Sequence, residues 1–242
     1  MRNRSALMPL QPSRPQFVFP RMTSVVKTLL FALLGCYVLQ LVLEGWLGIP
    51  VVGLLALTPG GIGLWQLLTY VLVDVGHPMM FLLGLLFIWW ALSPFELSFG
   101  RRATIQLCLV ATLAGALPVY LLGFFLAGSP PLFGSSVLWF GGISAYSWSH
   151  RNSVMSLFGM ATMTAKQFLL LMVGLSFLMF LASKNHSHFI ASLGAMAGGI
   201  GYIRWMSRPR SGPRIRKRAP RGGFRVIDGG AGRDSERPKY LN

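Results

Sequence analysis

Charged side chains are scarce in this chain: only 12% of its 242 residues are charged, while 53% are hydrophobic. A soluble domain carries about 25% charged residues, so this composition excludes an ordinary water-soluble enzyme or binding domain. Acidic residues are rarest, with six of them against 22 Lys and Arg. The composition predicts an integral membrane protein, in which a net charge of +16 first indicates orientation rather than a binding partner.

Cysteine is nearly absent, and both Cys36 and Cys108 lie inside apolar stretches, where the thiol behaves as a small hydrophobe. Their spacing offers neither a disulfide framework nor a metal site, and there is no phosphate loop or dinucleotide fingerprint. We therefore predict no cofactor and no metal. The first twenty residues lack an apolar core, so no cleaved signal peptide is expected. No ionisable residue lies in the middle of a long apolar run, which disfavours an ion-coupled carrier.

The chain contains several long apolar runs. A helix needs about 20 apolar residues to cross roughly 30 Å of hydrocarbon. We expect six spans, at residues 25–47, 78–92, 103–126, 135–148, 166–182 and 188–206. Residues 48–77 are apolar but broken by prolines and glycines, which predicts a partly embedded loop covered by other parts of the protein. The predicted fold is an all-α bundle of six transmembrane helices at 23–206, between a disordered lead-in, 1–22, and a disordered basic tail, 207–242.

The basic residues fall on alternate connections between these spans. They occur in the lead-in, at Arg101 and Arg102, between 151 and 166, and through the tail. The other connections carry no Lys or Arg apart from Lys184. Because cytoplasmic loops collect Lys and Arg, this pattern predicts a multi-pass protein of a bacterial plasma or inner membrane with both termini in the cytoplasm.

The stretch at 130–145 is unusually rich in glycine and serine for an apolar segment. Small residues let membrane helices approach closely, so we expect this helix at the centre of the bundle, with Gly134 and Gly141 as packing positions. Ser136 lies near its outer end. Ser144 lies near its cytoplasmic end, and we interpret it as a packing residue.

Several short motifs are spread along the chain in a recognisable order. They are LWQLLTY at 64–70, Glu96, GRR at 100–102, GSS at 134–136 followed by Phe140-Gly141, and LGAMAG at 193–198. Together they resemble the rhomboid superfamily of intramembrane serine proteases and their inactive relatives. The resemblance implies a serine nucleophile at the start of the fourth helix and a histidine base on the sixth. It also implies a histidine and an asparagine on the second helix that hold the oxyanion.

Carried over one residue at a time, the nucleophile falls on Ser136, but the glycine that follows it in the family is Val137. We expect Val137 to push the fourth and sixth helices apart or to force a repacking. The base position falls on Ser192, and a serine cannot accept a proton at neutral pH as imidazole does. His188, one turn (about 5.4 Å) nearer the outer surface on the same helix face, is the candidate for a displaced base. His186 lies farther out, and both histidines are alternatively interfacial residues without a catalytic role.

The oxyanion positions on the second helix fall on Met80 and Gly84, or on Met79 and Leu83 in the other register. None of these residues carries a donor side chain, and His77 would serve only if the loop were rebuilt. Losing one oxyanion donor typically costs about 10²–10³ in rate.

We therefore expect a rhomboid-like pseudoprotease that binds transmembrane segments of other membrane proteins without cutting them. The alternative is an active rhomboid-type intramembrane serine endopeptidase with Ser136 as nucleophile and His188 as base. A carrier or channel is a third and weaker interpretation.

Two further signals concern partners. Gly194 and Gly198 form a small-xxx-small face, which predicts packing against the fourth helix, with a homodimer seam as the alternative. The tail run Arg214–Arg225 predicts either contact with anionic membrane lipid or only orientation and solvation. Phe224 is the only aromatic residue in this run, too few for base stacking along a nucleic acid, so we predict no nucleic-acid partner.

Overall fold

The computed structural model describes residues 21–208, apart from 62, 126–127, 129, 151–153 and 158–160. The lead-in up to residue 20 and the tail from residue 209, with its basic run Arg214–Arg225, lie outside the described residues. Within the described ranges the chain is mostly helical, and three helices are long and apolar enough to cross a membrane. To this extent the predicted helical membrane protein is confirmed.

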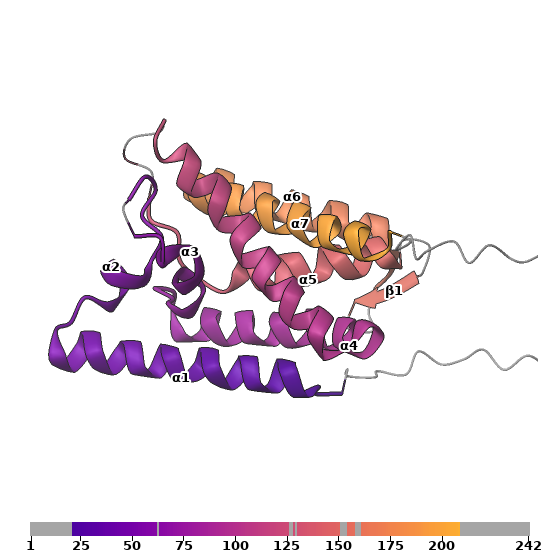
Figure 1. The fold of residues 1–242 in the computed structure, drawn as a ribbon, viewed down its shortest axis with the longest axis horizontal. Helices are drawn as coiled ribbons and strands as arrows, with labels where there is room; N and C mark the ends of the chain where they lie inside the picture. The colour runs from indigo at the N-terminus through magenta and orange to yellow at the C-terminus, as the bar shows by residue number, and fades with distance from the viewer. Residues whose placement is uncertain are drawn as a thin grey trace, which may run out of the picture. The chain divides into compact units, whose positions relative to one another are not determined.

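The helices follow one another as α1 Ser24–Leu47, α2 Val51–Leu55, α3 Gln66–Thr69, the 3₁₀ turn η1 Tyr70–Leu72, α4 Pro78–Leu122, α5 Ser136–Ser149, α6 Ala165–Ser183 and α7 His186–Met206 (Figure 1). The three candidate spans are α1, α4 and α6. Between α5 and α6, the strands β1 Val154–Leu157 and β2 Ala161–Thr164 pair antiparallel. The all-helical prediction missed this hairpin because strands of four residues are too short to give a clear alternation pattern.

The helix α4 is broken at Gly100, where φ is 83° and ψ is 171°. An unbroken helix of 45 residues would be about 68 Å long, more than twice the roughly 30 Å of a hydrocarbon core. Glycine adopts a positive φ without strain, so the break separates a first segment, 78–99, from a second segment, 101–122. The predicted second span ended at Leu92, but the helix continues through Pro94 to the break, because residues on both sides of that proline are buried.

The N-terminus of α1 is capped by a carboxylate of α4. Glu96 accepts hydrogen bonds from the backbone N–H groups of Val25 and Val26, at 3.2 Å each. The first N–H groups of a helix have no partner inside it, and a negative charge is favourable beside them. α1 therefore lies along the first segment of α4 (Figure 1), where Tyr37 stacks on Phe81 with ring centroids 4.0 Å apart.

The helix α5 is the most enclosed of the long helices. Nine of its fourteen residues are buried, and the six consecutive residues 140–145 cover every face of the helix. A Cβ on Gly141 would lie 2.5 Å from the Cβ of Ala111 in α4, and a Cβ on Gly199 of α7 would collide with the Gly141 carbonyl oxygen. The predicted central position of this helix is therefore confirmed.

Gly194 and Gly198 of α7 pack against α4 rather than α5, which corrects the predicted partner. A Cβ on Gly194 would collide with the carbonyl oxygen of Ala114, and one on Gly198 would lie 2.5 Å from the Ala114 Cβ. Pro118, four residues after Ala114, has no N–H to donate to that carbonyl, although α4 stays helical there. The freed oxygen faces Gly194, while the neighbouring Gly199 makes the contact with α5.

The helix α6 is packed along one stripe. Its buried residues recur every three or four positions, at Ala165, Phe168, Met172 and Ser176. Beyond Ser176 no residue of α6 is buried up to its end at Ser183. In that part its Phe180 ring stacks on Phe189 of α7, with centroids 5.0 Å apart.

Candidate functional site

Ser136 is the first residue of α5, and the segment before it is held from two sides. Gly134, with φ of 99°, donates its N–H to the Tyr70 carbonyl at 3.1 Å. On the other side, Ser187 of α7 donates its hydroxyl to the Pro130 carbonyl at 2.6 Å. A side chain at position 134 would strain this turn, so a glycine there fixes the direction in which α5 begins.

The loop at 48–77 forms part of the support for this turn. Leu57 and Leu132 exchange two backbone hydrogen bonds of 2.9 Å each. Tyr70, at the end of the LWQLLTY motif, donates its hydroxyl to the Thr112 carbonyl of α4 at 2.9 Å. Burial raises the pKa of Tyr70, so the phenol stays protonated and keeps this bond. The motif is thus an anchor that joins the loop to α4.

The Ser136 hydroxyl and the His188 imidazole come together where α5 and α7 begin. Ser136 Oγ and His188 Nε2 are 3.5 Å apart, and both residues are half-buried. The Asn185 side chain caps α7 by accepting the His188 backbone N–H at 3.1 Å. General-base catalysis needs about 2.6–3.2 Å, although longer separations are common before a substrate binds. The pair is therefore close, but looser than a working nucleophile and base.

Asp74 adds a carboxylate to this end of the molecule. It interacts electrostatically with His188, and its Oδ2 would lie 3.6 Å from a Cβ at Gly134. Its Oδ1 accepts the Gly76 N–H at 2.7 Å, and the Gln40 side chain of α1 pairs with its backbone. Asp74 belongs to none of the motifs noted in the sequence. It is the one acidic residue between 48 and 77, and that isolation in an apolar loop was the signal available.

No family model matches the chain, and no curated protein matches its sequence. Membership of the rhomboid superfamily therefore stays a prediction drawn from the motifs.

Ser192, at the expected base position, has its hydroxyl engaged within its own helix. Its hydroxyl donates to the His188 carbonyl one turn earlier in α7, at 2.8 Å, and the residue is 2% exposed. A hydroxyl in this bond supports its own helix. The one histidine whose side chain meets Ser136 in the described part of the chain is His188.

The expected oxyanion positions do not line the site. Met79 and Met80 are 68% and 67% exposed on the first segment of α4, and Leu83 is 40% exposed. A Cβ on Gly84 would have no atom within 4 Å. His77 is the exposed N-cap residue of α4. These positions face outward, whereas the first segment packs through other residues such as Phe81 and Ile88.

His186 and Ser144 have structural environments. The ring of His186, the first residue of α7, lies 5.3 Å from that of Phe180. Ser144 is fully buried and donates its hydroxyl to the Gly141 carbonyl at 2.9 Å. Ser144 is thus a packing residue of α5, far along the helix from Ser136.

Val137 is accommodated by α4. Its side chain is 1% exposed, and its Cγ1 would lie 3.1 Å from a Cβ at Gly115. The same Cβ would lie 3.1 Å from the Ala191 carbonyl oxygen of α7 and the Tyr70 hydroxyl. The valine thus fills the room that Gly115 leaves.

The start of α5 can stabilise negative charge. The first four N–H groups of an α-helix have no intrahelical acceptor, and Ser136 and Val137 are the first two residues of α5. The helix dipole adds positive potential at the same place. A developing oxyanion near Ser136 would therefore meet backbone donors, even though the expected oxyanion positions on α4 carry no donor side chain.

No group of three or more potential metal ligands occurs among the described residues, and Cys36 and Cys108 are both free thiols. Ser136, His188 and Asp74 bring a hydroxyl, an imidazole and a carboxylate to the region where α5 begins. Their chemistry is that of proton transfer and hydrogen bonding.

Proposed function

We propose that this chain is a rhomboid-like pseudoprotease of six membrane spans that binds transmembrane segments of other proteins without cutting them. In this topology the two segments of α4 are the second and third spans, α5 is the fourth, and α6 and α7 are the fifth and sixth. The loop at 48–77 is partly embedded, and both termini are cytoplasmic.

The proposal is supported chiefly by the residue at the expected base position, which is a serine rather than a histidine. Ser192 takes the place of the family's histidine and hydrogen-bonds to its own helix. The nearest imidazole, His188, is 3.5 Å from Ser136, and the oxyanion positions carry no donors. A serine hydroxyl without a well-placed base is a poor nucleophile. Client binding requires the scaffold but not the base.

The length of α5 fits a protected site inside the bilayer. Its fourteen residues span about 21 Å, roughly 9 Å less than the hydrocarbon core. With its C-terminal end at the cytoplasmic surface, Ser136 would lie below the outer surface. The backbone hydrogen bonds of Gly134 and Leu132 then satisfy non-helical polar groups at that depth, as the hydrocarbon core of a membrane requires.

We place the client between the first segment of α4 and α6. Near the cytoplasmic end these two helices meet through Trp90 and Phe168, whose rings are 5.5 Å apart. Toward the other end, Met80 on one wall and Leu178 on the other are 67% and 61% exposed. A guest helix entering from the lipid would lie against these exposed apolar side chains.

Photo-crosslinking of a defined client tests this placement. A crosslinking amino acid is introduced at position 80 or 178, and at Leu39 of α1 as a control that is 57% exposed. Each variant is reconstituted with one labelled single-span peptide. We expect crosslinks from positions 80 and 178, little from 39, and an intact peptide. Equal crosslinking from all three positions would indicate random collision and contradict the proposal.

Reporter fusions test the topology independently. A reporter after Asn242 should be cytoplasmic, and one inserted near Ser129 should be external, because the basic connections lie with the termini. An external C-terminal reporter would overturn the six-span arrangement.

The Ser136–His188 contact favours a second candidate function, an intramembrane serine endopeptidase. His188 Nε2 would accept the Ser136 proton as Oγ attacks a peptide carbonyl, and the first N–H groups of α5 would hold the oxyanion. Asp74, a carboxylate at the same end of the molecule, would offset part of the cost of charging the half-buried imidazole. This function requires the 3.5 Å separation to shorten when a substrate binds.

A further inference from the structure

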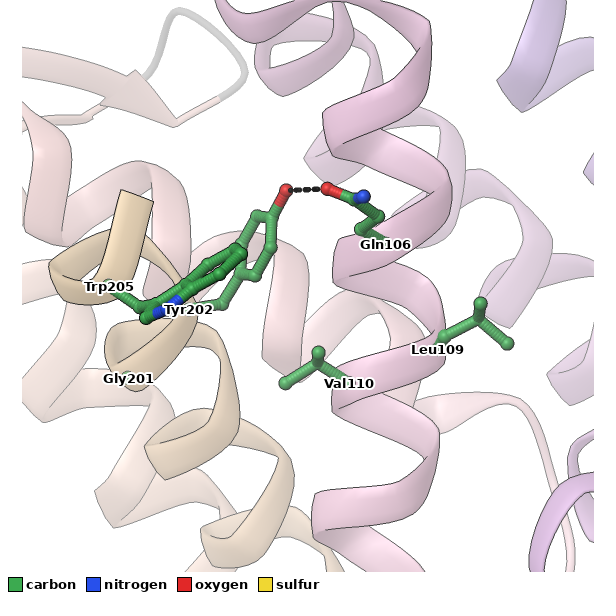
Figure 2. Close-up of a pocket in the computed structure, with 6 residues that line it drawn as sticks. All are labelled: Gln106, Leu109, Val110, Gly201, Tyr202 and Trp205. Carbon is green, nitrogen blue, oxygen red and sulfur yellow. Dashed lines mark hydrogen bonds between the residues drawn. The ribbon is translucent and has the colours of Figure 1, made fainter. Parts of the chain in front are cut away.

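A groove on the lipid-facing surface lies between the second segment of α4 and the end of α7, away from Ser136. Its lining residues are Gln106, Leu109, Val110, Gly201, Tyr202 and Trp205, and its volume is about 410 Å³ (Figure 2). Pockets for small ligands measure about 300–1,000 Å³, so the groove has room for part of one chain-like molecule. It belongs to neither wall of the proposed client site.

The groove has an apolar lining and one pair of polar side chains, Gln106 and Tyr202. Leu109 and Val110 line it from α4, and Gly201 leaves its α7 side open, since a Cβ there would have no atom within 4 Å. The Tyr202 hydroxyl donates to Gln106 Oε1 at 2.8 Å. The amide nitrogen of Gln106 lies on the side away from Tyr202 (Figure 2), where none of the described residues accepts from it.

Basic side chains lie at the same end of the groove as the Tyr202–Gln106 hydrogen bond. Arg102 precedes Gln106 by four residues, so the two lie on one face of α4, and Arg101 is its neighbour. Both arginines are exposed. Arg204 of α7 precedes Trp205 and packs over the Trp148 ring, 4.3 Å from its centroid.

The three acidic residues of the described ranges lie elsewhere. Glu44 and Asp74 belong to the opposite end of the molecule, around the 48–77 loop, and Glu96 is buried against the start of α1. The groove therefore joins an apolar trough to a cationic rim, which has no acidic partner within the described ranges. Tyr202 and Trp205 lie between them, and such side chains are enriched at the membrane–water interface.

We propose that this groove binds one anionic phospholipid of the cytoplasmic leaflet. An acyl chain lies against Leu109, Val110 and Gly201. The phosphate lies beside Arg102 and accepts a hydrogen bond from the Gln106 amide. A zwitterionic lipid offers the same chain but no net charge for the arginines, so the site discriminates by headgroup. The proposal rests on the cytoplasmic position of this end, which the reporter fusions test separately.

The test uses the full-length protein in bilayers that contain phosphatidylglycerol with a photoactivatable acyl chain. Crosslinked peptides are mapped by mass spectrometry. We expect crosslinks at 105–110 and 201–205 that are competed by unlabelled phosphatidylglycerol and not by phosphatidylcholine. Equal competition by both lipids would overturn the proposal, because the headgroup would then play no part.

Matched variants separate this site from the basic tail, which is unchanged in all of them. Gly201→Leu fills the groove, and Gly174→Leu makes the same change on α6 at a position that also has no atom within 4 Å. We expect crosslinking to fall only in Gly201→Leu. Arg102→Gln should weaken competition about fivefold, which corresponds to the roughly 1 kcal/mol that a basic residue contributes at an anionic surface. If Gly201→Leu leaves the crosslinks unchanged, or if the peptides crosslink to a second copy of the chain, the lipid assignment is wrong.

Discussion

The seam among α4, α5 and α7 and the wall made by α6 are built in opposite ways. In the seam, glycines and alanines bring backbones into direct contact, as at Gly194 against Ala114 and Gly199 against Gly141. In α6, one stripe is buried, and large side chains such as Leu170 and Leu178 are 73% and 61% exposed. Lipid tails are as apolar as leucine, so close backbone packing is what holds helices together in a membrane. The difference indicates a tightly packed scaffold around Ser136 and a side wall with a narrower packed face.

The largest expected effect on stability comes from a Gly→Ala substitution in the seam, compared with the same substitution in the α6 wall. Gly194→Ala places a Cβ into the Ala114 carbonyl and should destabilise the fold by about 3 kcal/mol or more, at the upper end of overpacking costs. Gly174→Ala on α6 meets no atom within 4 Å and should leave stability unchanged or slightly higher. Thermal unfolding in detergent compares the two. Similar losses in both variants would show that the seam and the wall are packed alike.

A smaller effect tests whether Val137 and Gly115 fit each other. Gly115→Ala alone should cost about 1–3 kcal/mol, because its Cβ meets Val137, Ala191 and Tyr70 at 3.1 Å. Val137→Ala alone should also destabilise, through lost burial. In the double variant the first clash is relieved, so the combined loss should be smaller than the sum by at least about 0.5 kcal/mol. Strict additivity in this double-mutant cycle would mean that the valine is accommodated elsewhere.

The smallest of the stability effects concerns the attachment of α1. Glu96→Gln removes the negative charge that caps α1 and should cost about 1 kcal/mol. Hydrogen exchange should accelerate at the Val25 and Val26 amides and stay unchanged in α7, since the cap touches only α1. Unchanged protection at those two amides would show that the cap contributes nothing.

The sequence predicted the parts of the fold that depend on composition and periodicity. Apolar runs located the long helices to within a few residues, apart from the extension of the second span beyond Leu92. The glycine and serine content of 130–145 predicted the enclosed helix, because small residues have one main use in a membrane bundle. The packing partner of Gly194 was not predictable, since a small-residue face does not say which helix it meets. It depends on the carbonyl that Pro118 frees in another helix.

The candidate site was predicted less completely. Ser136 was found from its motif, and His188 from its spacing to Ser192. The 3.5 Å approach of Ser136 and His188 depends on how α5 and α7 begin, and this is set by the turn at Gly134 and the bond from Ser187. Helical periodicity contains no information on such turns. Asp74 was missed for the same reason, because only the folded loop brings it near His188.

The central claim is that Ser136 is not an activated nucleophile, although His188 lies beside it. Purified protein in bilayers is treated with a fluorophosphonate probe, which reacts with serines activated by a base. We predict no labelling of the native chain, and little from Ser192→His alone, because the oxyanion positions on α4 still lack donors. Strong labelling of the native chain that both Ser136→Ala and His188→Ala abolish would contradict this claim. The chain would then be a protease with a displaced base.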